Sequence, residues 1–142
     1  MREATPTDLP TIRALLAAAD LPVEGLAAAL ADTVVEPDAH GAVVGAAAIE
    51  RHDGAALLRS VVVAPGVRGT GLGRRLVADR LRHAAATGLT DAYLLTTTAE
   101  AFFTGLGFRT VPRTEAPAGI AASPEFAALC PDTAAFMHRA LG

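Results

Sequence analysis

Residues 61–75 constrain the fold more than any other part of this chain. They read VVVAPGVRGTGLGRR: three valines suited to a buried strand, a Pro-Gly break, and glycines at 69, 71 and 73 beside arginines. A glycine inside a helix costs about 1 kcal/mol relative to alanine. A strand, a turn and a helix start that keep three glycines therefore indicate that something approaches the bare backbone there.

The helix after this break is predicted to begin near Gly71 and Leu72. The first amides of a helix have no intrahelical acceptor and lie at the positive end of its dipole, so residues 68–73 are predicted to bind an anion. Arg68 and Arg74 add guanidinium donors that suit phosphate. A pyrophosphate-bearing ligand fits this arrangement. The alternative is that the glycines only allow tight helix–sheet packing, which would not need the flanking arginines.

Two other phosphate-binding loops do not match this segment. A P-loop ends in Gly-Lys-Ser or Gly-Lys-Thr, and the chain contains no lysine. The dinucleotide fingerprint is G-x-G-x-x-G directly after a strand, whereas this chain has G-x-G-x-G after a proline turn.

The remaining sequence predicts a mixed α/β fold, and we expect residues 1–142 to form one domain. Thr7 is predicted to cap the first helix, and His52-Asp53-Gly54 indicates a hairpin turn with an exposed His52. Helices or helical turns are expected over 7–19, 23–31, 72–87, 99–106, 118–122 and 124–129, and strands over 2–4, 33–36, 41–50, 55–63, 91–97, 108–111 and 133–141. Strands joined by the long helix should run parallel, and hairpin-linked strands antiparallel.

Composition excludes several classes of protein. A net charge of −3 argues against nucleic acid as a partner, because phosphate backbones are bound by clustered positive charge. One cysteine, Cys130, rules out an internal disulfide and a cysteine-based metal cage. No apolar run approaches the roughly 20 residues of a membrane span, and the first residues do not resemble a secretory signal. We expect a cytoplasmic protein that binds neither nucleic acid, membrane nor metal.

Two motifs together resemble the GNAT superfamily of N-acetyltransferases. The first is R-G-T-G-L-G at 68–73 after the strand LLRSVVVAP, and the second is A-E-A-F-F-T-G-L-G-F at 99–108. The resemblance implies a single-domain GNAT fold, with a mixed central sheet, flanking helices and two parallel strands, 57–63 and 91–97, that splay apart. It also implies acetyl-CoA as the acyl donor, held in the gap between those strands.

The resemblance assigns donor-binding residues on both sides of the gap. The backbone of Val61, Val62 and Val63 would receive the pantetheine arm and the thioester carbonyl. Phe103 stands where many members of the family have a tyrosine that protonates the departing thiolate, so another donor such as water, Ser60, Thr97 or Cys130 would be needed. The pyrophosphate would be held by the backbone of Arg68, Gly69, Thr70, Gly71, Leu72, Gly73 and Arg74.

The acceptor side carries three further predictions. Glu50, near the end of its strand, is predicted to act as general base through a water, or else to be an ordinary strand-end charge. Arg59 lies among apolar residues, so it either binds a substrate carboxylate or pairs with a structural carboxylate. Thr96 and Thr97 can offer hydroxyls at the same cleft, or simply suit a strand.

Two segments narrow the resemblance within the superfamily. YLLTTTAEAFF and EFAALCPDTA are similar to a branch that includes N-acetylglutamate synthase domains and small N-acetyltransferases linked to arsenic resistance. That similarity implies an amino-acid-like amine as the acceptor, and relatives also suggest a homodimer paired through edge strands. The alternative function is a CoA-binding sensor or regulatory domain without turnover, which the missing tyrosine hydroxyl at Phe103 keeps open.

Overall fold

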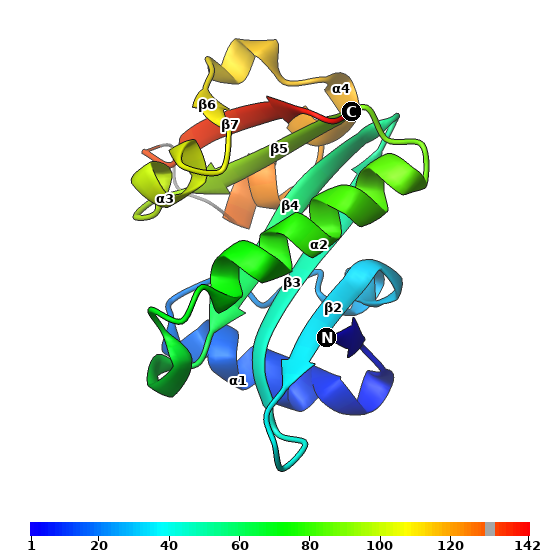
Figure 1. Cartoon of the computed structure of the whole chain (residues 1–142). Helices are drawn as coiled ribbons and strands as arrows, with labels where there is room; N and C mark the ends of the chain where they lie inside the picture. The colour runs from blue at the N-terminus through cyan, green and yellow to red at the C-terminus, as the bar shows by residue number, and fades with distance from the viewer. Residues whose placement is uncertain (130–132) are drawn as a thin grey trace.

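The computed structural model describes residues 1–129 and 133–142, so Cys130 lies outside the described residues. The chain forms a single-domain α/β fold around one seven-stranded mixed sheet of order β1-β2-β3-β4-β5-β7-β6 (Figure 1). The strands are β1 (Arg2–Glu3), β2 (Thr33–Pro37), β3 (Val43–His52), β4 (Ala55–Val63), β5 (Asp91–Thr96), β6 (Arg109–Thr110) and β7 (Ala135–Ala140).

The parallel pair β4 and β5 is joined at one end only. The register pairs Ala55 with Asp91, Ala56 with Ala92 and Leu57 with Tyr93, and stops there, although β4 continues to Val63. All other strand pairs are antiparallel. The predicted splay between these two strands is therefore confirmed, and it opens the sheet on the carboxyl side of Leu57.

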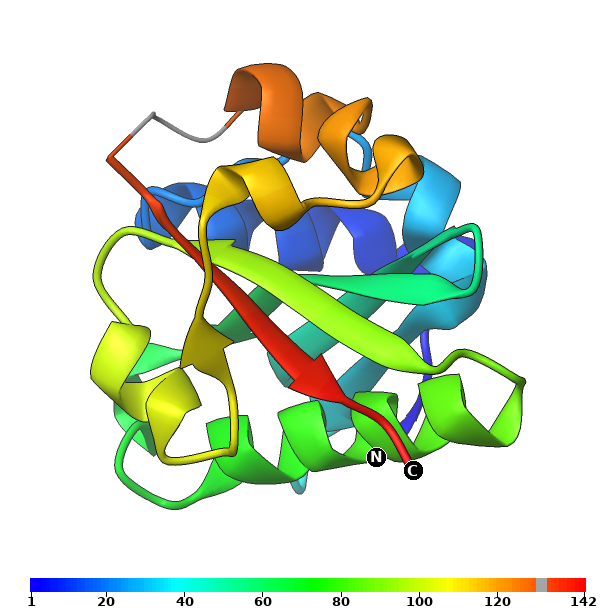
Figure 2. The same cartoon turned by 90° about the horizontal axis from the view of Figure 1, so that it is seen from above.

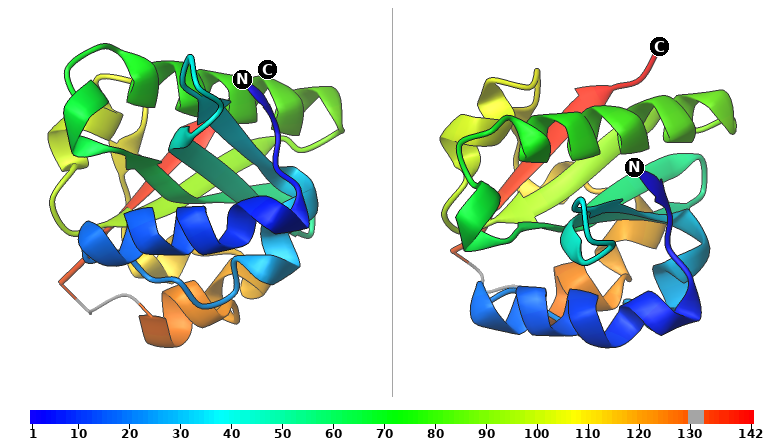
Figure 3. Two further views of the ribbon diagram at one scale, coloured as in Figure 1. Left: turned by 90° about the horizontal axis from the view of Figure 1, so that it is seen from below. Right: turned by 60° about the horizontal axis from the view of Figure 1, so that its bottom comes forward.

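Helices cover both faces of the sheet (Figure 2). The helix α2 (Leu72–Ala86) presents an apolar stripe to one face, and α1 (Leu9–Ala18) lies on the other face, as Figure 3 shows. Ile12, Leu16, Leu76 and Val77 are almost completely buried beneath them. Two apolar layers thus sandwich the sheet, as expected when each helix carries one hydrophobic face.

The chain after β5 closes the second half of the sheet. It comprises α3 (Glu100–Thr104), β6, a 3₁₀ turn at Arg113–Glu115, α4 (Ala118–Ala121) and a π-helical turn at Glu125–Leu129. The last two lie on the same side of the sheet as α1 (Figure 2). Gly119 packs α4 against the β3–β4 hairpin, because a Cβ there would come within 2.9 Å of the Asp53 carboxylate.

Three local expectations are wrong. The predicted second helix over 23–31 is only a 3₁₀ turn, Ala27–Asp32, because Gly25 takes the left-handed region at φ +83° and ends any earlier helix. The first helix is entered through a 3₁₀ turn at Pro6–Asp8, whose start is capped by Asp8 and Thr5 rather than Thr7. β3 extends two residues beyond Glu50, which removes His52 from the turn.

Candidate active site

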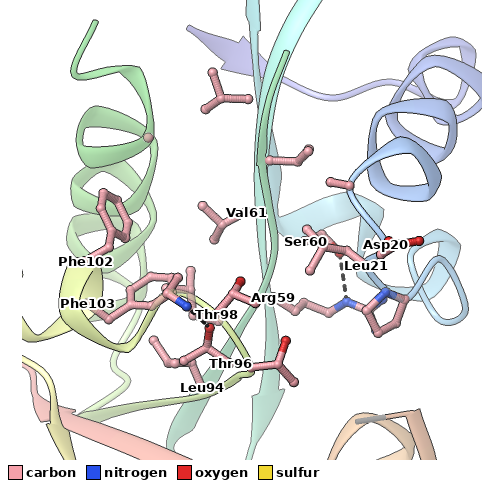
Figure 4. A pocket seen from close by; sticks show the side chains of 18 of the residues that line it. Asp20, Leu21, Arg59, Ser60, Val61, Leu94, Thr96, Thr98, Phe102 and Phe103 are labelled. Carbon is pink, nitrogen blue, oxygen red and sulfur yellow. Dashed lines mark hydrogen bonds between the residues drawn. The ribbon is translucent and has the colours of Figure 1, made fainter. Parts of the chain in front are cut away.

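An open cleft of about 1330 Å³ lies where β4 and β5 separate. Its walls come from residues 58–63 of β4, residues 94–99 at the end of β5 and just after it, the loop 67–74, α3, and residues 17–24 at the end of α1 and just after it. Part of this lining is drawn in Figure 4. We call the part around residues 67–74 the glycine-loop half, and the part formed by Arg59, residues 17–24 and Glu125 the Arg59 half.

The glycine-loop half is made of backbone. Gly69 and Gly71 adopt φ of +80° and +83°, a region that side-chain-bearing residues rarely enter, and a Cβ on Gly69 would meet only open space. The first hydrogen bond into α2 runs from the Arg75 amide to the Gly71 carbonyl at 3.1 Å. The amides just before Arg75 therefore precede the intrahelical ladder, at the positive end of the helix dipole.

Two details of this loop differ from expectation. The Arg68 amide already donates to the Pro65 carbonyl at 3.4 Å, so the predicted run of available amides is shorter by one residue. Thr70 is outside the cleft lining, and its hydroxyl donates to the Val67 carbonyl at 2.6 Å. Arg68 and Arg74 do line the cleft, so the loop presents both backbone and guanidinium donors to it.

A bulge in β4 forms the floor of the cleft. Ala46 pairs with Val62 and Ala48 pairs with Arg59. Two residues of β4, Ser60 and Val61, therefore lie opposite one residue of β3, Ala47. Ser60 has φ +56°, a strained conformation for a residue with a side chain. The bulge interrupts the ladder and re-aims the backbone. In Figure 4, Val61 lies on the side of the phenylalanines, and Ser60 on the side of Asp20 and Leu21.

The wall opposite β4 combines core packing with cleft lining. Phe103 is 7% exposed and packs edge-on against Phe108 with ring centroids 5.9 Å apart, yet it also lines the cleft. Thr96 accepts a hydrogen bond from the Ala99 amide at 3.0 Å, so its hydroxyl shapes the turn into α3. Thr97 is exposed and lines the cleft.

Arg59 is the centre of a buried polar network. Its Nη1 donates to Glu50 Oε2 at 2.7 Å, its Nη2 to the Glu24 carbonyl at 2.6 Å and its Nε to Ser60 Oγ at 3.1 Å. The guanidinium is also 3.6 Å from the carboxylate of Glu125, and only 1% of the side chain is exposed. The structure therefore shows the structural ion pair that was one of the two roles predicted for Arg59.

Glu50 accepts a hydrogen bond from this guanidinium. It is not among the residues that line the cleft in the described part of the chain. Its second oxygen, Oε1, is 2.8 Å from His52 Nε2, so both oxygens have a close partner. The expectation of an exposed His52 is wrong, because its side chain is 21% exposed and reaches Glu50.

Sequence reasoning missed two contributors to the Arg59 half. The segment 17–24 reaches the cleft through a turn in which Asp20 takes φ +56°, and Gly25 follows with its Cα against the guanidinium. A Cβ on Gly25 would lie 2.8 Å from Arg59 Nη1. Glu125 lines the cleft from the π-helical turn. The signal for Glu125 is its place in EFAALCPDTA, one of the two segments that narrow the resemblance.

The residues present fit a CoA thioester. Left-handed glycines and helix-start amides suit its pyrophosphate, and the splayed strands leave a gap for an extended arm beside Val61 to Val63. When bound, such a thioester supplies an activated acyl group. A fold and cleft of this kind define an acyl-CoA-dependent acyltransferase.

The chain belongs to the GNAT acetyltransferase family. The family described as "Acetyltransferase (GNAT) domain" matches residues 27–110, more than half of the sequence. Its members take acetyl-CoA as the acetyl donor, so the predicted donor and fold are confirmed. A search of curated proteins finds none that matches this sequence.

Several solved structures have the same fold. Rv2747 from Mycobacterium tuberculosis, in complex with CoA and NLQ, is 25% identical, covers 99% of this chain and 98% of its own, and has a TM-score of 0.83. N-acetylglutamate synthase from Neisseria gonorrhoeae, complexed with coenzyme A and N-acetyl-glutamate, is 21% identical with a TM-score of 0.85; this chain matches 34% of its length. The Escherichia coli N-acetyltransferase YhbS, in complex with CoA, is 24% identical over 99% of this chain and 80% of its own, with a TM-score of 0.75.

Within residues 1–129 and 133–142, no helix has the length and apolarity needed to cross a membrane.

Proposed function

We propose that this protein transfers the acetyl group of acetyl-CoA to the amine of a small, amino-acid-like acceptor. The observation that carries the proposal is the position of Arg59, a buried guanidinium in the cleft lining beside the β4 bulge. Three of its five N–H donors make the bonds described above. We assign the other two to the carboxylate of the acceptor.

The branch of the family supports the same class of acceptor. The segments YLLTTTAEAFF and EFAALCPDTA favour the branch of N-acetylglutamate synthase domains and arsenic-resistance N-acetyltransferases. The Neisseria enzyme, complexed with N-acetyl-glutamate, is an instance of this fold with an acetylated amino acid bound. We infer that this chain, over residues 1–142, is a single catalytic domain of that branch.

The chain's own groups fill the remaining roles. Helix-start amides and Arg74 hold the pyrophosphate, and the β4 backbone orients the thioester carbonyl. Ser60 accepts its hydrogen bond from Arg59, which leaves its hydroxyl proton for the departing thiolate. Thr97 offers a hydroxyl to the acceptor, whereas the Thr96 hydroxyl serves α3. Glu50 as a base acting through water stays a prediction.

The experiment is a measurement of CoA release, followed with a thiol reagent, from acetyl-CoA and a panel of amines. The panel holds glutamate, other amino acids, phosphinic and arsenical amino-acid mimics, polyamines and an N-terminal peptide. Turnover confined to the amino-acid-like acceptors is expected. Turnover only with polyamines or peptides would overturn the acceptor class. CoA binding without any turnover would favour the sensor alternative.

Two expectations lie outside this assay. The cytoplasmic location and the pairing of two copies stay predictions, and light scattering on the purified protein tests the second.

A further inference from the structure

Glu125 has no role in the acetyl transfer proposed above. It lines the cleft, is only 6% exposed, and carries an oxygen 3.6 Å from Arg59 Nε. A carboxylate held in such a place is costly unless charge or hydrogen bonding compensates it. Glu125 lines the cleft beside Arg59, the residue assigned to the acceptor carboxylate, so the acceptor would lie close to it.

The segment that carries Glu125 is firmly anchored. The Phe126 ring packs edge-on against Phe136 with centroids 5.2 Å apart, and the Arg113 guanidinium lies 5.3 Å from the centre of the same ring. The Ser123 hydroxyl donates to the Ile120 carbonyl at 2.7 Å and accepts from the Phe126 amide at 3.3 Å. The following turn is π-helical, a geometry frequent at functional sites. Glu125 is thus presented to the cleft from a fixed backbone.

Glu125 and Glu50 flank the same guanidinium but differ in access. Glu50 accepts close hydrogen bonds at both oxygens, from Arg59 at 2.7 Å and at 2.8 Å from His52. It also lies outside the cleft lining, whereas Glu125 forms part of it. A general base must come within hydrogen-bond reach of the proton it removes, directly or through one water. Glu125 meets this condition more closely than Glu50.

Building on the proposed function, we propose that Glu125 is the general base that activates the acceptor amine. The Glu125 carboxylate takes one proton from the acceptor ammonium and later releases it to solvent. The neutral nitrogen then attacks the thioester carbon; the C–N bond forms and the C–S bond breaks. The Ser60 hydroxyl gives its proton to the CoA sulfur, and the second proton lost by the nitrogen replaces it on Ser60. Products are the N-acetylated acceptor, CoA thiol and one proton.

The pairing of Glu125 with Arg59 also defines the acceptor more narrowly. A carboxylate and a guanidinium 3.6 Å apart present adjacent opposite charges to the cleft. An α-amino acid carries an ammonium and a carboxylate on one carbon, so its two charges match this pair in sign and spacing. The acceptor that this pair fits is the α-amino group of a zwitterionic amino acid. A polyamine, or a side-chain amine far from any carboxylate, fits it less well.

The test compares E125Q with E50Q, and with E115Q, a change at an exposed glutamate of the 3₁₀ turn. The acceptor is whichever α-amino acid the panel identifies. E125Q is expected to lower kcat about 100-fold or more, the usual scale for a general base, while its affinity for CoA stays within about twofold of wild type. E115Q is expected to leave both values unchanged. Wild-type circular dichroism spectra at the assay temperature, together with retained CoA affinity, show that the fold is kept. The midpoint of thermal unfolding should fall in E50Q and E125Q, because each leaves the buried Arg59 guanidinium with one carboxylate fewer.

A pH profile separates a base from a merely structural glutamate. The neutral fraction of a mostly protonated amine rises about tenfold per pH unit, so the rate of E125Q should climb with that slope and approach wild type at high pH. A parallel deficit at every pH, a rise in KM alone, or a loss confined to E50Q would overturn the assignment to Glu125. Absence of turnover by the wild type would instead count against the proposed function, so the two failures are distinguishable.

Discussion

The glycine-loop half of the cleft is contiguous in sequence and offers backbone amides with the flanking Arg68 and Arg74, whereas the Arg59 half combines groups from three segments that are distant in the sequence. Residues 67–74 supply one half almost alone. The other half needs Arg59 from β4, residues 17–24 from the end of α1 and beyond, and Glu125 from beyond β6. Backbone amides can bind the pyrophosphate of CoA, a part of the donor that is the same for all members of the family. Side chains on separate segments can change independently, which suits the part that selects an acceptor.

The sharpest way to break this contrast is to remove the Arg59 guanidinium. In R59M, Glu50 loses its 2.7 Å partner and Glu125 its nearby cation. Breaking one side of a buried ion pair costs about 3–5 kcal/mol, so the free energy of unfolding should fall by that amount. Urea unfolding measures it.

The R59M/E50Q double variant is the control. In this variant residue 50 is uncharged, so no Glu50 carboxylate is left without its guanidinium. The double variant should therefore regain part of the free energy of unfolding lost in R59M, because residues in contact are coupled in a double-mutant cycle. In R59M the affinity for CoA, measured by calorimetry, should stay within about threefold of wild type. A collapse of CoA affinity would show that the two halves are not separable.

The complementary change is G71E in the glycine-loop half. Gly71 has φ +83° and stands at the start of α2. A carboxylate there repels the pyrophosphate and occupies its place, so the affinity for CoA should fall roughly 100-fold, or about 2.7 kcal/mol. Calorimetry with CoA checks this.

G41E controls for backbone strain. Gly41 has φ +84° with nothing within 4 Å of its Cβ position, and it lies outside the cleft lining. This variant should be strained to a similar degree yet bind CoA normally. An equal loss of CoA affinity in G41E would trace the effect of G71E to the fold.

The ease of prediction differs between the halves for a physical reason. Free amides at a helix start follow from local rules, so the helix beginning at Leu72 could be predicted from contiguous residues. The splay of β4 from β5 was instead implied by the resemblance to the GNAT superfamily, and the strand register confirms it. The donor-binding role of the Val61 to Val63 backbone was implied by the same resemblance and stays a prediction. The local rules did not predict the hydrogen bond of the Arg68 amide, which donates to the Pro65 carbonyl in a 3₁₀ turn.

The Arg59 half depends on contacts that no local pattern encodes. The alanine-rich stretch 23–31 favours a helix by propensity, but Gly25 must turn left-handed to lie against Arg59 Nη1. That contact joins residues far apart in the sequence. Glu125 reads as an ordinary charge until the chain brings it to within 3.6 Å of Arg59. Tertiary context therefore decides this half.

G25A tests that tertiary contact with a smaller effect. Alanine in the left-handed region costs about 1–2 kcal/mol, and its Cβ would also press on Arg59 Nη1 at 2.8 Å. We expect the KM for the acceptor to rise severalfold and CoA affinity to hold. G54A, at φ +85° with open space around its Cβ, carries the strain alone. If G25A and G54A have the same kinetics, the turn does not position Arg59.

The smallest expected effect concerns Asp8, which helps to fasten the start of α1 and thereby the segment that leads to the Arg59 half. Hydrogen bonds from the Arg2 guanidinium, at 2.8 and 3.0 Å, and from the Thr5 amide lower the pKa of Asp8 to about 2. The folded pKa lies below the unfolded value of 3.8. Its stabilisation is therefore present above about pH 4 and is lost as the pH falls toward 2.

In D8N this contribution is absent at every pH. The acid-unfolding midpoint, followed by circular dichroism, should move upward by roughly a few tenths of a pH unit, and the difference from wild type should shrink below pH 2. Screening by salt should reduce the effect, because Arg2 is 43% exposed. Unfolding that begins at α1 should weaken acceptor turnover before CoA binding, since α1 leads into residues 17–24 and not into the glycine loop. Simultaneous loss of both activities would mean that the sheet, rather than α1, gives way first in acid.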